Sequence, residues 1–142
     1  MYQKILLCVD LHDEASWRKS LPAAVEICQS FGAELHILTV VPDLPSGVLK
    51  LYLPEGRAVN LIRESDTSLA EFVSRHLAKS PTAHQHVGQG TVYRVILETA
   101  GTIGADLIVM GSHSPAMSDF MLGPNAARVV RHSDRSVLVV RE

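Results

Sequence analysis

Short runs of valine, isoleucine and leucine constrain the fold of this chain more than any other feature. Four of them cover residues 5–9, 35–41, 107–110 and 137–140. Nearly continuous apolar runs of this length are typical of parallel strands that are buried on both faces. A fifth, weaker strand is expected over residues 83–87, where a His-Gln-His sequence indicates one exposed face near the edge of a sheet.

Longer segments with helical periodicity separate these runs. Apolar residues recur at three- to four-residue spacing over residues 15–30, 55–79, 92–103 and 126–132. Pro22 lies within the first segment, where it would either kink the helix or mark its true start. Strands that alternate with helices predict an α/β fold, because right-handed crossovers then build an open, doubly wound sheet of five parallel strands with helices on both faces. We expect a single domain, residues 1–142.

Composition excludes several classes of partner. The chain is 46% hydrophobic and carries a net charge of −2, with 13 Lys and Arg against 15 Asp and Glu, so it lacks the basic field that attracts nucleic acid or an anionic membrane. No apolar run reaches the roughly 18 residues of a membrane span, and the first run is too short for a signal sequence. We therefore expect a cytoplasmic protein without membrane insertion. Cys8 and Cys28 are expected to be buried thiols rather than a disulfide.

Ligands of an open α/β sheet bind at the carboxyl ends of the strands, where the strand order reverses. Asp10 ends the first strand, and it could bind a ribose hydroxyl or cap a helix; the sequence leaves both open. The fourth run ends at Met110 and continues into Gly111-Ser112-His113-Ser114, and a later Gly123-Pro124-Asn125 begins the last helix. Glycines allow close approach of the backbone and a helix N-terminus offers free N–H groups, so the arrangement suits a phosphate. Gly-Pro also starts many helices that bind no ligand.

Sequence motifs of several other ligand-binding and catalytic sites are absent. The chain contains no P-loop sequence, no G-x-G-x-x-G after the first strand and no G-x-S-x-G elbow. His84 and His86 would share one face of a strand, but no cysteine or carboxylate cluster accompanies them, so we expect exposed imidazoles and no metal site. His36 is expected to be an ordinary histidine of the core or the sheet face.

Several segments resemble the universal stress protein family. They are residues 4–10, 38–42, 90, 107–113, 122–126, 129–132 and 136–141. The resemblance spans the chain, with only residues 42–80 nonspecific, and implies a Rossmann-like sheet in the order 3-2-1-4-5 with ATP at the ends of the first and fourth strands. The chain departs from the family's glycine pattern at Ser114 and Pro124, and its spacer before Gly123 is one residue shorter. This shortened loop is similar to a branch of the family that includes ATP binders.

Carried onto this sequence, the resemblance implies a site for ATP together with Mg²⁺. Asp10 would bind the ribose, and Cys8 would lie beside the base. Val40 and Val41 would pack against the adenine, and Met110 and Gly111 would line the ribose. The residues near the phosphates would be Ser112, His113, Ser114, Gly123, Pro124 and Asn125.

The last strand, from Ser136 to Arg141, would lie at a sheet edge, and in the family it pairs with a second chain. The resemblance thus implies a homodimer, with higher assembly left open, that acts as an ATP-binding stress-response regulator of a further protein. One alternative is a dimeric scaffold of the same fold that needs no nucleotide. The other is a slow ATPase or a phosphoryl or nucleotidyl transferase, which Asp10 and His113 could support. The H-x-G-H signature of adenylyl-transferring relatives is absent, so we assign no catalytic residue.

Overall fold

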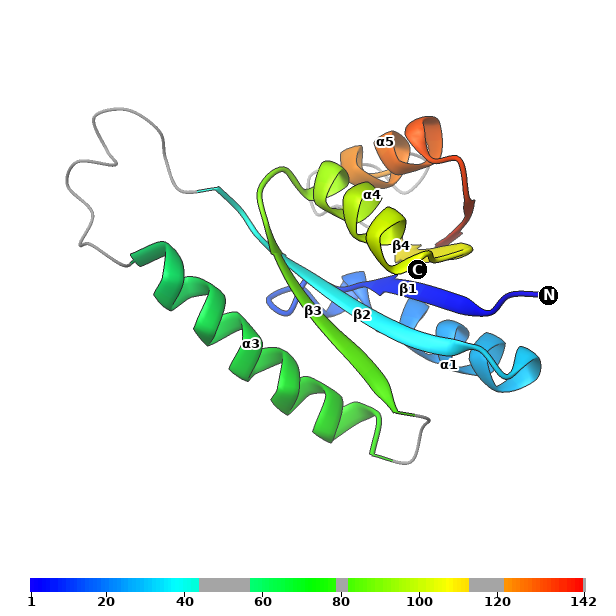
Figure 1. Ribbon diagram of the computed structural model, residues 1–142, viewed down its shortest axis with the longest axis horizontal. Helices are drawn as coiled ribbons and strands as arrows, with labels where there is room; N and C mark the ends of the chain where they lie inside the picture. The colour runs from blue at the N-terminus through cyan, green and yellow to red at the C-terminus, as the bar shows by residue number, and fades with distance from the viewer. Residues whose placement is uncertain (44–56, 79–81, 113–121, 142) are drawn as a thin grey trace.

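The structure, a computed structural model, describes residues 1–43, 57–78, 82–112 and 122–141. Five strands in these parts form one parallel sheet in the order β3-β2-β1-β4-β5, which confirms the predicted fold (Figure 1). The strands are β1 (Lys4–Cys8), β2 (Glu34–Val41), β3 (Ala83–Gln89), β4 (Leu107–Gly111) and β5 (Ser136–Val140). The helices are α1 (Ser20–Phe31), α3 (Arg57–His76), α4 (Val92–Ile103) and α5 (Pro124–His132), with a short 3₁₀ helix η1 (Glu14–Ser16).

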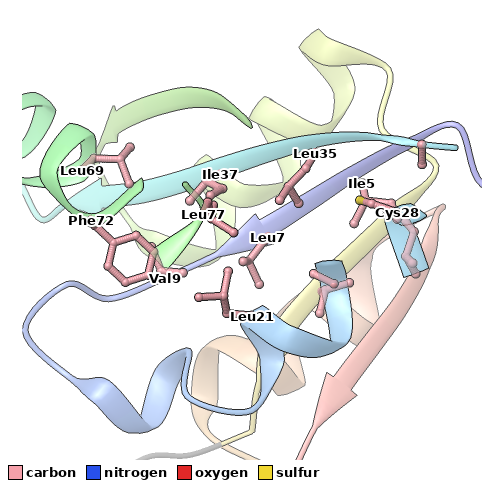
Figure 2. Packing of buried hydrophobic residues seen from close by; sticks show 14 residues of the cluster. Ile5, Leu7, Val9, Leu21, Cys28, Leu35, Ile37, Leu69, Phe72 and Leu77 are labelled. Carbon is pink, nitrogen blue, oxygen red and sulfur yellow. The ribbon is translucent and has the colours of Figure 1, made fainter. Parts of the chain in front are cut away.

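Two helical layers cover the sheet, with α1 and α3 on one face and α4 and α5 on the other (Figure 1). Successive side chains of a strand point to opposite faces, so each buried strand contributes to both cores. Ile5 and Leu7 of β1 pack under α1 and α3, whereas Leu6 between them packs against α4 and α5. Figure 2 shows the first of these cores, where Leu69 and Phe72 of α3 meet the strands.

The first helix begins later than its periodicity predicted. η1 precedes it, and α1 starts at Ser20, which places Pro22 in the first helical turn. The N–H groups of a first turn have no intrahelical acceptor, so a proline is tolerated there. Pro22 therefore marks the start of the helix and does not kink it. Gly32, with φ of 65°, ends α1 in the left-handed conformation that glycine adopts readily.

The edge strand β3 is longer than predicted and extends to Gln89. Gly88 interrupts its side-chain pattern, but its backbone still pairs with Val40 of β2. The missing side chain lets α4 approach closely: a Cβ at Gly88 would lie 2.3 Å from Cγ1 of Val95. Most of the connection between β2 and α3, and most of that between β4 and α5, lies outside the described residues. None of the described helices is long and apolar enough to cross a membrane.

Candidate functional site

A cavity of about 460 Å³ opens at the carboxyl ends of the strands, within the size range of small-molecule sites. It lies beside β1, which has β2 on one side and β4 on the other. The strand order therefore reverses at this point of the sheet. This is the switch point at which open α/β sheets bind ligands. Its lining comes from β1 and the turn after it, β2, β4, and the N-terminal turns of α4 and α5: Cys8, Val9, Asp10, His12, Asp13, Ser16, Leu38, Val40, Pro42, Val92, Ile96, Met110, Gly111, Gly123, Pro124, Asn125 and Ala126.

The structure brings most of the predicted site residues together in this cavity. They are Cys8, Asp10, Val40, Met110, Gly111, Gly123, Pro124 and Asn125. Val41 is not among the lining residues, because alternation along β2 turns its side chain to the opposite face from Val40. His113 and Ser114 lie outside the described residues.

Ser112 does not line the cavity either; it acts through its backbone. Its N–H donates to the Val140 carbonyl at 3.0 Å, and its carbonyl accepts from the Gly123 N–H at 3.1 Å. These bonds join the end of β4 to β5 and to the start of α5. Ser112 therefore fixes where Gly123 and the following helix turn stand at the cavity.

A hydrogen-bonded turn after β1 forms the acidic wall of the cavity. Asp10 Oδ1 accepts from the His12 N–H at 3.0 Å, and the Asp10 N–H donates to Ser16 Oγ at 2.9 Å. Ser16 Oγ in turn donates to the Asp13 carbonyl at 2.7 Å. Asp13, and not Asp10, caps η1, since its Oδ1 accepts from the Ala15 N–H at 3.1 Å. Asp10 is thus an exposed carboxylate held at the cavity mouth by a turn, and helix capping is not its role.

The start of α5 forms the opposite wall. Gly123 is its buried N-cap residue and makes no side-chain capping bond, and Pro124 occupies the first turn. The first intrahelical bond runs from the Ala127 N–H to the Gly123 carbonyl at 3.0 Å. The N–H groups of Asn125 and Ala126 precede it and have no acceptor within the helix. Together with the helix dipole they make this wall suitable for an anion.

The floor between these walls is apolar. Cys8, Leu38, Val40 and Met110 supply it from the strands, and α4 contributes Val92 and Ile96. Burial raises the pKa of the Cys8 thiol to about 12, so the thiol stays protonated and behaves as a small apolar group rather than a nucleophile. The cavity can therefore hold a ligand with a flat apolar part and an anionic part.

Sequence reasoning missed a second set of lining residues: Val9, His12, Asp13, Ser16, Leu38, Pro42, Val92 and Ile96. Val92 and Ile96 are four residues apart and thus share one face of α4. That spacing was visible in the sequence, but it did not show which end of the helix reaches the switch point. The turn holding His12, Asp13 and Ser16 carries no periodic signal.

The fold and the cavity define a class: a doubly wound α/β protein with a cavity at the switch point of its sheet. The chain belongs to the universal stress protein family, because the profile described as "Universal stress protein family" matches residues 1–141. Among curated proteins, it is 34% identical over 143 residues to universal stress protein G of Shigella flexneri, covering 99% of this chain and 100% of that protein.

Solved structures of similar proteins share the fold. Universal stress protein UspA from Lactobacillus plantarum has a TM-score of 0.77 at 23% identity, covering 99% of this chain and 98% of that one. A universal stress protein in complex with cAMP has a TM-score of 0.64 at 23% identity, covering 99% and 97% of the two chains. The universal stress protein from Archaeoglobus fulgidus in complex with dAMP has a TM-score of 0.66 at 20% identity, covering 99% and 98%.

Proposed function

We propose that this stress protein is a cytoplasmic regulator that binds ATP, with Mg²⁺, in the switch-point cavity, and that the bound nucleotide changes its assembly or its binding to a protein partner. The observation that carries the proposal is the shape of the cavity: an apolar floor between an exposed carboxylate and a helix N-terminus. Two proteins of the same fold are in complex with the adenine nucleotides cAMP and dAMP, which supports an adenine nucleotide as the ligand class.

Each part of the nucleotide has a matching wall. The adenine ring would lie on the apolar floor beside Val40 and Cys8, where burial of its faces is favourable. The ribose hydroxyls would donate to the Asp10 carboxylate. The phosphates would accept from the backbone N–H groups that start α5, at Asn125 and Ala126, and the cation would arrive with the phosphates.

The proposal includes the homodimer implied by the resemblance. β5 forms one edge of the sheet among the described strands, and residues 137–140 of it are half-buried. An edge strand made of a continuous apolar run is a template for pairing with another strand. Two copies of β5 would pair about a two-fold axis and extend the sheet across both chains.

Native mass spectrometry of the purified protein, with and without ATP and Mg²⁺, tests both parts. We expect a dimer that gains one nucleotide per chain. Asp10→Asn and Gly123→Val should each weaken binding at least tenfold, because the first removes a charge at the ribose and the second adds a side chain at the phosphate wall. Gly101→Ala is the matched control, since a Cβ there meets nothing within 4 Å. A protein that ignores ATP, or site variants that bind as tightly as the control, would refute the site.

A further inference from the structure

A second cluster of polar side chains lies toward the amino end of the sheet face that carries the cavity. β2 contributes Glu34 and His36, and the edge strand β3 contributes His84 and His86. His36 and His84 are direct partners in the parallel register, and His86 stands opposite Leu38. Even-numbered residues of the two strands share one face, so all four side chains project to the same side.

Short contacts converge on His36. Its Nε2 lies 3.2 Å from Glu34 Oε2, and its Nδ1 lies 2.9 Å from His86 Nε2. The ring of His84 stacks on that of His36 with centroids 4.5 Å apart and an interplanar angle of 18°. One donor atom from each of Glu34, His36 and His84 lies within 4.8 Å of the other two.

The contacts fix the tautomer of His36. A carboxylate accepts hydrogen bonds only, so the proton of His36 is on Nε2 and is donated to Glu34. Nδ1 is then an acceptor, and the His86 Nε2–H donates to it. His36 is only 7% exposed, and hydrogen bonds on both ring nitrogens hold the ring in place. Glu34 and His84 are exposed, so their side chains are free to adjust around it.

We propose that Glu34, His36 and His84 bind a divalent transition-metal ion, for which Zn²⁺ is the best match. Two imidazoles and one carboxylate form a donor set that zinc accepts, with a water molecule as the fourth ligand. His36 would bind through Nε2, the atom that already faces Glu34. Its proton would then be on Nδ1 and would be donated to His86 Nε2, which in turn would carry its own proton on Nδ1. Metal-binding histidines commonly make such a bond with the ring nitrogen that does not hold the metal.

Coordination requires the exposed ring of His84 to rotate out of its stack on His36, because a metal ion lies in the plane of each imidazole that binds it. Zinc bonds of about 2.0–2.1 Å at tetrahedral angles separate ligand atoms by about 3.3 Å. The exposed side chains of Glu34 and His84 can make this closure while the buried His36 stays in place. Lys4 is the register partner of Glu34 and opposes a cation by its charge. Its ammonium group donates to the Ile103 carbonyl at 3.3 Å, which occupies it at the end of α4.

Burial and hydrogen bonding shift the pKa values of the groups in this cluster. Burial lowers the pKa of His36, although the hydrogen bond to Glu34 opposes this effect, and burial also lowers the pKa of His86. The hydrogen bond from His36 lowers the pKa of Glu34.

Calorimetric titration of tag-free, chelator-treated protein with ZnCl₂ tests the proposal. We expect one Zn²⁺ per chain. Loss of a hydrogen-bond partner of a ligand typically costs 10–100-fold in affinity, so loss of a ligand in His84→Gln or Glu34→Gln should cost at least about tenfold. Both side chains are exposed, so these variants should fold, whereas substitution of the buried His36 would also disturb packing. His132→Gln, at an exposed histidine of α5, is the matched control.

Imidazole ¹⁵N spectra supply a second readout. Zn²⁺ should move the proton of His36 from Nε2 to Nδ1, and titration of the His132→Gln control should show the same change. Absence of zinc binding, or binding that survives both His84→Gln and Glu34→Gln unchanged, overturns the site. Zinc binding with no change in the His36 tautomer also overturns it.

Discussion

A single added methyl group at Gly111 should damage both the fold and the cavity. Gly111 ends β4 directly beside the backbone of η1. A Cβ at this position would lie 2.8 Å from the Ser16 carbonyl oxygen and 3.3 Å from the Ser16 carbonyl carbon. Because both contacts are to backbone, no side-chain rotation relieves them. Gly111→Ala must therefore push the end of β4 and η1 apart.

The size of the effect follows from two opposing terms. Overpacking of this kind costs about 1–3 kcal/mol, and a clash with backbone belongs in the upper half of that range. Replacing glycine by alanine also restricts the unfolded chain, which returns about 0.4–1 kcal/mol. We expect a net loss of about 1–2.6 kcal/mol in the free energy of unfolding. Moving Ser16 also disturbs its hydrogen bonds to Asp10 and Asp13, so nucleotide affinity should fall with stability.

Urea unfolding followed by circular dichroism measures the stability term, and calorimetric titration with ATP measures the affinity. Gly101→Ala is the control because this exposed glycine lies within α4 and has no neighbour near a Cβ. Alanine in a helix interior should stabilise the protein by about 0.5–1 kcal/mol. If Gly111→Ala matches wild type in both measurements, the contact with Ser16 does not constrain the protein and the reasoning fails.

Three further predictions test the packing and the buried thiol. Gly88→Ala should lower the free energy of unfolding by about 2 kcal/mol, because its Cβ would clash with the side chain of Val95. In a double-mutant cycle measured by urea unfolding, adding Val95→Ala should recover at least about 1 kcal/mol of that free energy. Purely additive losses would contradict the contact. Leu69→Ala should cost about 2–5 kcal/mol in the same assay, since Leu69 is fully buried, and a loss below 1 kcal/mol would contradict its place in the core. The Cys8 thiol has a pKa of about 12 when folded and an ordinary value of 9.0, so its contribution to stability is complete below pH 9 and is lost as pH rises toward 12. Between pH 8 and pH 10 wild type should therefore lose about 1.4 kcal/mol more than Cys8→Ala, and equal losses would show that the thiol ionises normally.

The sheet could be predicted from the sequence because four of its strands are covered on both faces. Burial on both faces removes polar residues from a strand, and a run of Val, Ile and Leu then has few other interpretations. The same logic weakens at β3, where one face is open and Gly88 and Gln89 lack an apolar signal. Their membership in the strand comes from backbone pairing with β2, which leaves no mark on side-chain choice.

Site residues at the ends of strands could be predicted from the sequence. Site residues that reach the cavity through the packing of helices were missed. Asp10, Met110 and Gly123 stand at element boundaries that the sequence reveals, and the topology brings those boundaries together. Ser16 and Ile96 reach the cavity only because η1 folds back over β4 and α4 crosses β2. Such approaches depend on three-dimensional packing rather than on local periodicity.

One face of the sheet shows how β2 can contribute side chains to two separate places. Leu38 of β2 packs under Val95 and Ile96 of α4, so the helix covers the middle of that face. Val40, two residues further along β2, lines the cavity, whereas His36, two residues back, meets Glu34 and the histidines of β3. A helix that crosses a sheet obliquely leaves both ends of the outer strands less covered than their middle. Polar side chains at the amino end of this face therefore need hydrogen-bond partners other than the helix. In β2 and β3 they bond to one another across the two strands. These residues are far apart in the linear sequence, so the sequence alone does not show that they pair.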